Sequence, residues 1–544
     1  MLYNLYMDYL PTTDLRSNPM IYRIYVRSFF DSDGDGIGDL KGITTKLPYF
    51  SSIGIDTICI SSILESDGKD YYFGVTDHRR INPALGTLSD LEGLLNEAHK
   101  HNLRVYLSFP LSFTSLSHTW FEKSRASTSL NPYREYYIWR TGKGRSVPEK
   151  TRTIFNTPLW AFDKRSGEWY RCLHGEKYPD LNFDNPRVRK EILDILRFWR
   201  GKSVDGFIVE NAHFATDKIL LPDQTPLYKP GEEFFTEGRG LFRMLRDIKE
   251  KCDGTFPLLL DTESTALGIS PYLLSTDSPV ADELIISDCI ASDNIIDKQS
   301  FSMKEFIKTY LSIQNSVCAT KTLLAFGSKD HSRLLSRIAS PSDSTYIPAA
   351  KLLAALLLSS KAIPSFYQGE EIGMSDFTTF KQSEHKGYTN DPNLLHARSP
   401  FQWDNNPNAA FTENTFSAIP VNENYHKINL LTQWSDDESV ISFYRRLILF
   451  RKNSSALQDG SFRDIPNGDI LCYLRETENE SLLIVANPTA KPLNAKLPKE
   501  LIGKSALCVL SNYNIFSKAL NATMGLRPYE VRIYRLSAPN LALN

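Results

Sequence analysis

The sequence predicts an α/β fold: a (β/α)8 TIM barrel with an inserted small domain after the third strand and an antiparallel β domain at the C-terminus. Short runs of β-branched or aromatic residues alternate with segments of helical period, as in a parallel sheet with crossover helices. Eight such runs occur, which is the strand number of this barrel. The runs span residues 21–29, 56–60, 104–109, 206–210, 257–261, 284–288, 322–328 and 363–368.

Two interruptions of this pattern define the predicted domains. Residues 114–186 are polar and rich in aromatic side chains, and they form too long a stretch for an ordinary loop after a strand. We therefore predict an inserted domain over 114–186, with the barrel divided into 1–113 and 187–455 around it. From residue 456 the helical pattern stops, and short alternating segments indicate an antiparallel β domain over 456–544.

The composition limits the kinds of molecule that the protein is expected to bind. The chain has 544 residues and a formal net charge of −2, so it lacks the basic surplus that attracts nucleic acid. No run of about 20 apolar residues is present. Residues 1–30 lack the basic and then apolar layout of a secretory signal. We predict no nucleic-acid partner and find no signal peptide or transmembrane helix in the sequence, while self-association stays open.

A cluster of acidic residues follows the first predicted strand and indicates a cation site. Four aspartates, Asp31, Asp33, Asp35 and Asp39, occur in a segment whose glycines permit sharp turns, and the carbonyl of Ile37 lies within reach. Four neighbouring carboxylates repel one another unless a cation neutralises them, although a solvated acidic turn is the alternative. Flexible oxygen ligands favour calcium over magnesium. We therefore predict that these five residues bind Ca²⁺.

Many short motifs of the chain resemble the α-amylase family of glycoside hydrolases, in particular its oligosaccharide-cleaving branch. The motifs occur in the family's order and extend from residue 21 to the C-terminal β domain. The resemblance implies the barrel, the inserted domain and the C-terminal domain predicted above. The motifs are residues 21–29, 38–43, 77–83 with 86–87, 114–115 with 118–121, 131–137, 179–182, 205–207, 367–373 and 399–404.

The resemblance also implies an active site, and here the sequence departs from the family. The mechanism uses a carboxylate nucleophile, a carboxylic acid and a further aspartate, which fall on Glu210, Glu263 and Asp330. The segment Gly206-Phe-Ile-Val-Glu210 stands where the family has Gly-Phe-Arg-Val-Asp. Ile208, which stands in place of the arginine, can neither hold the nucleophile ionised nor donate a hydrogen bond to it. Family residues are also replaced at Phe73, Gly74, Ser108, Ser112, Phe113, Ser328 and Lys329.

These replacements predict a site without catalysis. We expect the three carboxylates Glu210, Glu263 and Asp330 to be vestigial and no residue to be catalytic. Phe113 and Ile208 are expected to fill the space that a sugar ring would need.

Within the family, the chain resembles the rBAT-type heavy subunits of heteromeric amino-acid transporters. Residues 72–77 and the pair Thr262-Glu263 carry this resemblance. It implies a catalytically inactive ectodomain that chaperones a membrane light subunit at the extracellular face of the plasma membrane, if an upstream anchor exists. Two alternatives stay open: an α-glucosidase acting on small α-glucosides, and a soluble carbohydrate-binding pseudoenzyme.

Overall fold

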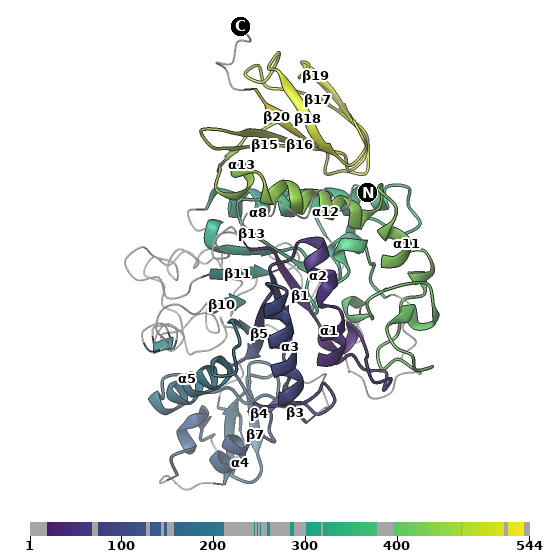
Figure 1. Ribbon diagram of the computed structural model, residues 1–544. Helices are drawn as coiled ribbons and strands as arrows, with labels where there is room; N and C mark the ends of the chain where they lie inside the picture. The colour runs from purple at the N-terminus through teal and green to yellow at the C-terminus, as the bar shows by residue number, and fades with distance from the viewer. Residues whose placement is uncertain are drawn as a thin grey trace.

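Eight parallel strands close into a barrel at the centre of the molecule (Figure 1). The computed structural model describes residues 19–67, 74–126, 131–142, 146–148, 157–210, 244, 247–248, 251, 258–261, 283–287, 301–316, 319–377, 396–468, 470–515 and 520–537. In order around the barrel the strands are β1 (Ile21–Ile24), β13 (Ile363–Tyr367), β12 (Thr322–Ala325), β11 (Glu283–Ser287), β10 (Leu258–Asp261), β9 (Gly206–Glu210), β5 (Arg104–Pro110) and β2 (Thr57–Ile60). All eight predicted strands are present, and the predicted fold class is confirmed.

One apolar side chain from each of seven strands meets inside the barrel. These side chains are nearly or fully buried, and they fill the interior as a packed layer rather than a pore. Ile208 of β9 belongs to this layer and is 1% exposed. The members are Ile21, Cys59, Tyr106, Ile208, Leu259, Leu323 and Ile363.

Helices cover the outside of the barrel, and local sequence signals set several of their ends. The α3 helix begins with a capping box, in which the Thr87 side chain and Asp90 satisfy each other's backbone N–H groups. The α5 helix begins at Pro186 after the capping side chain of Asn185. None of the described helices has the length and apolar character needed to cross a membrane. The α-helices are α1 (Leu40–Thr45), α2 (Leu47–Ile53), α3 (Leu88–Lys100), α4 (Thr119–Arg125), α5 (Pro186–Arg200), α8 (Met303–Asn315), α9 (Leu334–Ile338), α10 (Tyr346–Leu358), α11 (Leu430–Trp434), α12 (Val440–Lys452) and α13 (Ser455–Gln458), and the 3₁₀ helices are η2 (Val26–Ser28), η3 (Arg134–Tyr136), η8 (Ala319–Lys321), η9 (Glu370–Ile372), η11 (Pro407–Ala410) and η12 (Glu423–His426).

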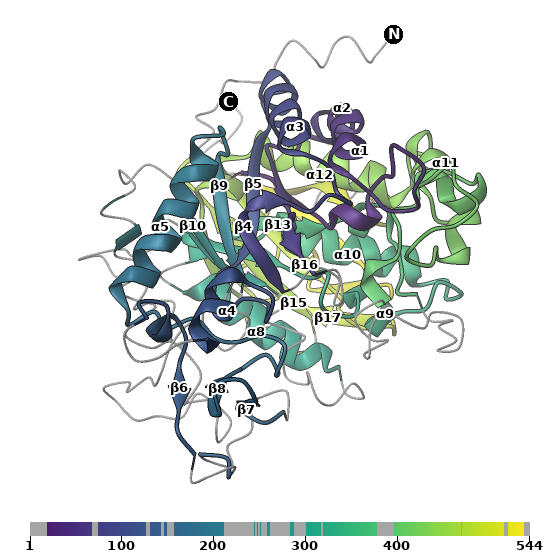
Figure 2. The ribbon, with the colours of Figure 1, turned by 90° about the horizontal axis from the view of Figure 1, so that it is seen from below.

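Two small sheets extend from the end of the barrel where its strands finish, which we call the mouth. β3 (Leu64–Ser66) and β4 (Val75–Ile81) form an antiparallel pair after β2. Within the segment that follows β5, β6 (Trp139–Arg140), β8 (Glu168–Arg171) and β7 (Trp160–Asp163) form a three-stranded sheet, which lies apart from the barrel in Figure 2. The exact domain boundaries at 113, 186 and 455 stay predictions.

An antiparallel β domain follows the barrel, as predicted. Its main sheet has the order β14-β15-β16-β20-β18, and a second sheet pairs β17 with β19. Figure 1 shows these sheets on the far side of α8 and α12 from the segment that carries β7. The strands are β14 (Ser461–Asp464), β15 (Leu471–Glu476), β16 (Ser481–Ala486), β17 (Leu493–Lys496), β18 (Ala506–Ser511), β19 (Thr523–Leu526) and β20 (Val531–Leu536).

Two buried arginines brace the base of the barrel, the end at which the strands begin, and the second of them joins it to the C-terminal β domain. Arg451 of α12 donates to the carbonyl oxygens of Leu358 (2.8 Å), Ser360 (2.8 Å) and Ala362 (3.2 Å). Arg475 of β15 donates to the carbonyls of Ser359 (2.9 Å) and Ser360 (2.5 Å). These carbonyls lie where α10 ends and the chain approaches β13. The arginines therefore satisfy helix-end acceptors that burial would otherwise leave without water.

Candidate active site and cation loop

Glu210 is the last residue of β9, so its side chain projects at the mouth of the barrel. β9 pairs with β5 in a register that sets Glu210 opposite Pro110 and Ile208 opposite Ser108. The hydroxyl of Ser108 donates to Glu210 Oε1 over 2.5 Å. Glu210 is 5% exposed. The strand pairing therefore brings together two residues that are 102 positions apart in the sequence.

Lys329 follows β12 and contacts both carboxylates of the predicted site that the structure describes. Its ammonium lies 3.4 Å from Glu210 Oε1 and 2.6 Å from Asp330 Oδ2. The side chain of Lys329 is 15% exposed. Burial alone would lower the pKa of Lys329, but the charges of Asp330 and Glu210 outweigh burial and hold that pKa above its usual value. Lys329 is therefore a cation in the neutral pH range.

Asp330 is held by a second cation, Arg398. The guanidinium of Arg398 donates to Asp330 Oδ1 over 2.6 Å, and its Nε donates to the carbonyl of Lys329 over 2.8 Å. Burial favours the neutral carboxyl of Asp330, but Lys329 and Arg398 together lower its pKa well below the usual range. The guanidinium also lies 5.2 Å from the centroid of the Tyr25 ring. Asp330 is thus ionised and fixed between two cations.

The remaining sequence-predicted residues lie in different surroundings. Phe113 is fully buried, with its ring 4.6 Å from that of His174 and 5.4 Å from that of Tyr178. Ile208 lies in the packed layer inside the barrel. Both side chains are therefore enclosed by protein groups. Phe73 and Glu263 lie outside the described residues.

Two other residues supply Glu210 with what Ile208 lacks, a charge and a hydrogen-bond donor. Lys329 supplies a positive charge from another strand end, and Ser108 supplies a hydrogen-bond donor. Sequence reasoning treated Lys329 and Ser108 only as losses from the family pattern. The one available signal was that a lysine directly precedes a retained aspartate at the end of a strand.

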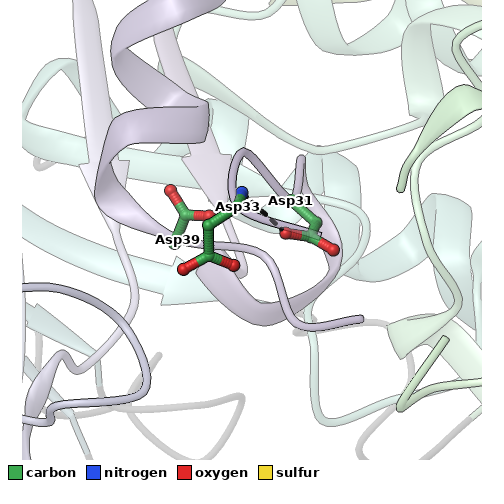
Figure 3. A group of neighbouring side chains, drawn as sticks. All are labelled: Asp31, Asp33 and Asp39. Carbon is green, nitrogen blue, oxygen red and sulfur yellow. Dashed lines mark hydrogen bonds between the residues drawn. The ribbon is translucent and has the colours of Figure 1, made fainter. Parts of the chain in front are cut away.

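The acidic loop after β1 and η2 brings three of its four aspartates together. Ligand oxygens of Asp31, Asp33 and Asp39 all lie within 4.8 Å of one another (Figure 3). Asp35 instead accepts a hydrogen bond from the backbone N–H of Ile37 over 2.7 Å. Burial, together with the charges of the neighbouring aspartates, raises the pKa of Asp35 above its usual value. The convergence of three hard carboxylate groups fits a divalent cation such as Ca²⁺.

Backbone and hydroxyl donors already shape this loop. Asp31 accepts from the N–H groups of Gly34 and Gly36, each over 2.8 Å, and from the hydroxyl of Thr412 over 2.6 Å. Asp39 accepts from Ser32 and also caps α1. These bonds hold Asp31 and Asp39 in place, so a cation would meet carboxylates that are already oriented.

Two family models cover nearly all of the described fold. A model described as the alpha amylase catalytic domain matches residues 23–460. A second model, described as the maltogenic amylase C-terminal domain, matches residues 461–533. The division between the two models lies directly before β14, the first strand of the C-terminal domain.

Similar proteins match over almost their whole length. The chain is 31% identical to an oligo-1,6-glucosidase of Parageobacillus thermoglucosidasius over 96% of this chain and 98% of that protein. It is 32% identical to a probable oligo-1,6-glucosidase of Bacillus subtilis over 97% of this chain and 100% of that protein. Among solved structures, an isomaltulose synthase mutant from Erwinia rhapontici in complex with sucrose superposes with a TM-score of 0.86 at 28% identity, covering 97% of this chain and 100% of the other.

These comparisons overturn the expected role in amino-acid transport. The similar proteins named above are glucosidases and a sugar synthase, and they match this chain from end to end. The prediction of a catalytically inactive heavy subunit with a membrane light subunit as its partner is therefore wrong. It depended on residues 72–77 and 262–263, two short motifs that carry far less information than a match along 96% of the chain. The comparisons do not support a degraded site either. A place at the extracellular face of the plasma membrane stays a prediction.

Proposed function

The chain belongs to the α-amylase family of glycoside hydrolases, and on that basis we propose that it is an α-glucosidase that hydrolyses small α-glucosides, with Glu210 as its nucleophile. The observation that carries this proposal is the environment of Glu210, a buried carboxylate at a strand end that receives a hydroxyl donor and an ammonium on one oxygen. Active sites of this barrel are built at the ends of the strands. The described contacts both involve Oε1, and we assign the attack to Oε2.

The proposed reaction proceeds with retention of configuration. Glu210 attacks the anomeric carbon and forms a covalent glucosyl intermediate while Glu263 protonates the departing oxygen. Water then attacks the intermediate, with Glu263 accepting the proton of that water. Asp330, fixed by Lys329 and Arg398, offers a charged acceptor for sugar hydroxyl groups. The role of Glu263 rests on the family resemblance, because its position lies outside the described residues.

Names of the related proteins suggest the kind of substrate. Two of them are called oligo-1,6-glucosidases, and a solved relative holds sucrose. We therefore propose short α-glucosides, with α-1,6-linked isomaltose tested ahead of maltose and sucrose. Because a longer carboxylate stands at position 210 and a hydroxyl at position 108, we expect the preferred sugars to differ from those of the relatives.

Turnover by the purified chain tests this proposal. An aryl α-glucoside and the three disaccharides would be incubated with the wild-type protein between pH 4 and pH 9, a range that includes the usual pKa of a carboxyl group. Glu210→Gln is the matched control, because it preserves size and removes only the charge. Glucose release that the control abolishes supports the proposal. Release that is absent, or that equals the release by the control, contradicts it.

We further propose that a Ca²⁺ ion binds the acidic loop through Asp31, Asp33 and Asp39, with Asp35 and the Ile37 carbonyl as additional ligands. The convergence of three carboxylates supports this assignment. Such an ion would neutralise the loop and stabilise the mouth of the barrel, and it takes no part in the reaction described above.

A further inference from the structure

We propose that Lys329 is a positioning residue, which offers a positive charge to Glu210 Oε1 and directs that oxygen away from the substrate, so that Oε2 is presented for attack. This inference rests on the proposed function and adds to it a residue that supplies the positive charge from β12. The lysine acts through Glu210 and Asp330 and needs no contact with the sugar.

Positive charge is distributed unevenly over the two carboxylates. Within the described part of the chain, Lys329 is the one cation found within salt-bridge distance of Glu210. Asp330, in contrast, has both Lys329 and Arg398 as partners at 2.6 Å. Loss of the lysine charge therefore leaves Asp330 paired and leaves Glu210 without its described cation. The two carboxylates should respond very differently to the same substitution.

The ammonium of Lys329 is anchored by Asp330. A lysine side chain is flexible and cannot position a partner unless its own ammonium is fixed. Asp330 Oδ2 accepts from this ammonium over 2.6 Å, and Arg398 donates to the lysine carbonyl over 2.8 Å. The contact with Glu210 is longer, at 3.4 Å. Lys329 is therefore tethered to Asp330 and oriented toward Glu210.

Glu210 receives both of its described donors on one side of the carboxylate. Ser108 and Lys329 approach the same oxygen, Oε1, from two strand ends. Two donors on one oxygen stabilise the ionised carboxylate and restrict its rotation. Other charged or titratable groups near this network are His331 beside Asp330, Tyr25 beside Arg398, and Tyr367 near Arg398 and Asp330. Among the residues that the structure describes, Lys329 is the one cation that forms an ion pair with Glu210.

The pH dependence of kcat/KM for an aryl α-glucoside tests the inference. Lys329→Met removes the charge and keeps the length of the side chain. Without the ammonium beside it, the carboxylate of Glu210 loses a favourable charge interaction, so the acid limb of the profile should move to higher pH, with kcat falling more than KM rises. Lys329→Arg should keep the limb near its wild-type position.

Two controls separate positioning from a structural role. Lys308→Met makes the same substitution at a lysine that is 78% exposed, and it should leave the profile unchanged. If Lys329→Met does not fold, Lys329→Gln replaces it with the same expectation for the acid limb. A lower rate with an unmoved acid limb shows that the lysine serves only packing, and that result overturns the inference.

A measurement without turnover distinguishes this inference from the proposed function. Urea unfolding of Lys329→Met, Glu210→Gln and the double variant forms a double-mutant cycle. The effects of the two substitutions should be non-additive, because each removes the partner of the other. Non-additivity in a protein without glucosidase activity contradicts the proposed function but supports the pairing. Additive effects overturn the pairing even in an active enzyme.

Discussion

At the mouth of the barrel, Lys329 and Arg398 face carboxylates, whereas at its base Arg451 and Arg475 face backbone carbonyl oxygens. Both groups of cations are largely buried. The mouth holds opposite charges a few ångströms apart, an arrangement that can respond to a substrate or a proton. The base holds cations on fixed acceptors at the end of a helix, an arrangement that can only hold elements together. For these cations, the kind of partner indicates the role better than the degree of burial does.

The largest expected effect tests the mouth. Glu210→Gln should lower kcat/KM by a factor of about 10⁴ or more, because it removes the nucleophile. The free energy of unfolding should change by less than about 2 kcal/mol, since the amide can still accept from Ser108. Steady-state kinetics and urea unfolding of one preparation provide both numbers. If Glu210→Gln loses much stability and little rate, then the mouth of the barrel has the structural role that we assign to its base.

The next effect tests the base. Arg451→Met should lower the free energy of unfolding by about 3 to 5 kcal/mol, because several buried carbonyl groups lose their donor together. Arg535→Met is the control, since its side chain is 49% exposed and pairs at the surface with Glu480. The control should cost less than about 1 kcal/mol. Similar losses in both variants would show that the buried contacts add nothing.

A smaller effect concerns the acidic loop at the mouth, where the carboxylates accept hydrogen bonds from uncharged donors. Removal of calcium by a chelator should lower the free energy of unfolding by about 2.7 kcal/mol when calcium had been present at a hundredfold excess over its dissociation constant. In Asp33→Asn the calcium effect should shrink, because one of the three converging carboxylates is lost. Melting curves with and without chelator provide the measurement, and identical curves would show that the loop binds no calcium.

The smallest effect concerns the loss of stability at low pH. We expect it to come from His78, a buried histidine of β4. His118 accepts from the backbone N–H of Trp120 through Nδ1, so its Nε2 carries the proton and donates to His78 Nδ1 over 3.2 Å. Burial lowers the pKa of His78 to about 3, and the charge of Arg79 acts in the same direction. The unfolded chain, with an ordinary histidine pKa near 6.5, therefore binds more protons than the folded protein between these two values. The free energy of unfolding consequently falls as the pH falls through this window.

By pH 5, His78 alone should account for about 2 kcal/mol of this loss. Urea unfolding at pH 7 and pH 5 measures it, with His78→Gln expected to show the smaller difference. Arg451→Met should keep the wild-type difference, because arginine does not titrate in this window. An unchanged difference in His78→Gln would place the acid sensitivity elsewhere.

The barrel could be predicted from the sequence because buried parallel strands produce continuous apolar runs. The first strand is shorter than predicted, since Val26–Ser28 form a 3₁₀ turn, η2, after Ile24. The positions of Glu210 and Asp330 at strand ends also followed from the sequence. Their partners did not, because Ser108 and Lys329 reach Glu210 only after the barrel closes. Judging each replacement by itself predicted a degraded site, whereas the contacts show two replacements acting on the same carboxylate.

The contacts of Arg475 have a consequence for any attempt to shorten this protein. The family models divide the chain at residue 460, yet Arg475 lies beyond that point and donates to Ser359 and Ser360, which precede the final barrel strand. Tyr473 adds a hydroxyl contact to Ser359 from the same strand. A chain cut at the boundary between the models would lack side chains that belong to the closure of its own barrel. Although sequence comparison separates the two domains, we expect them to unfold together.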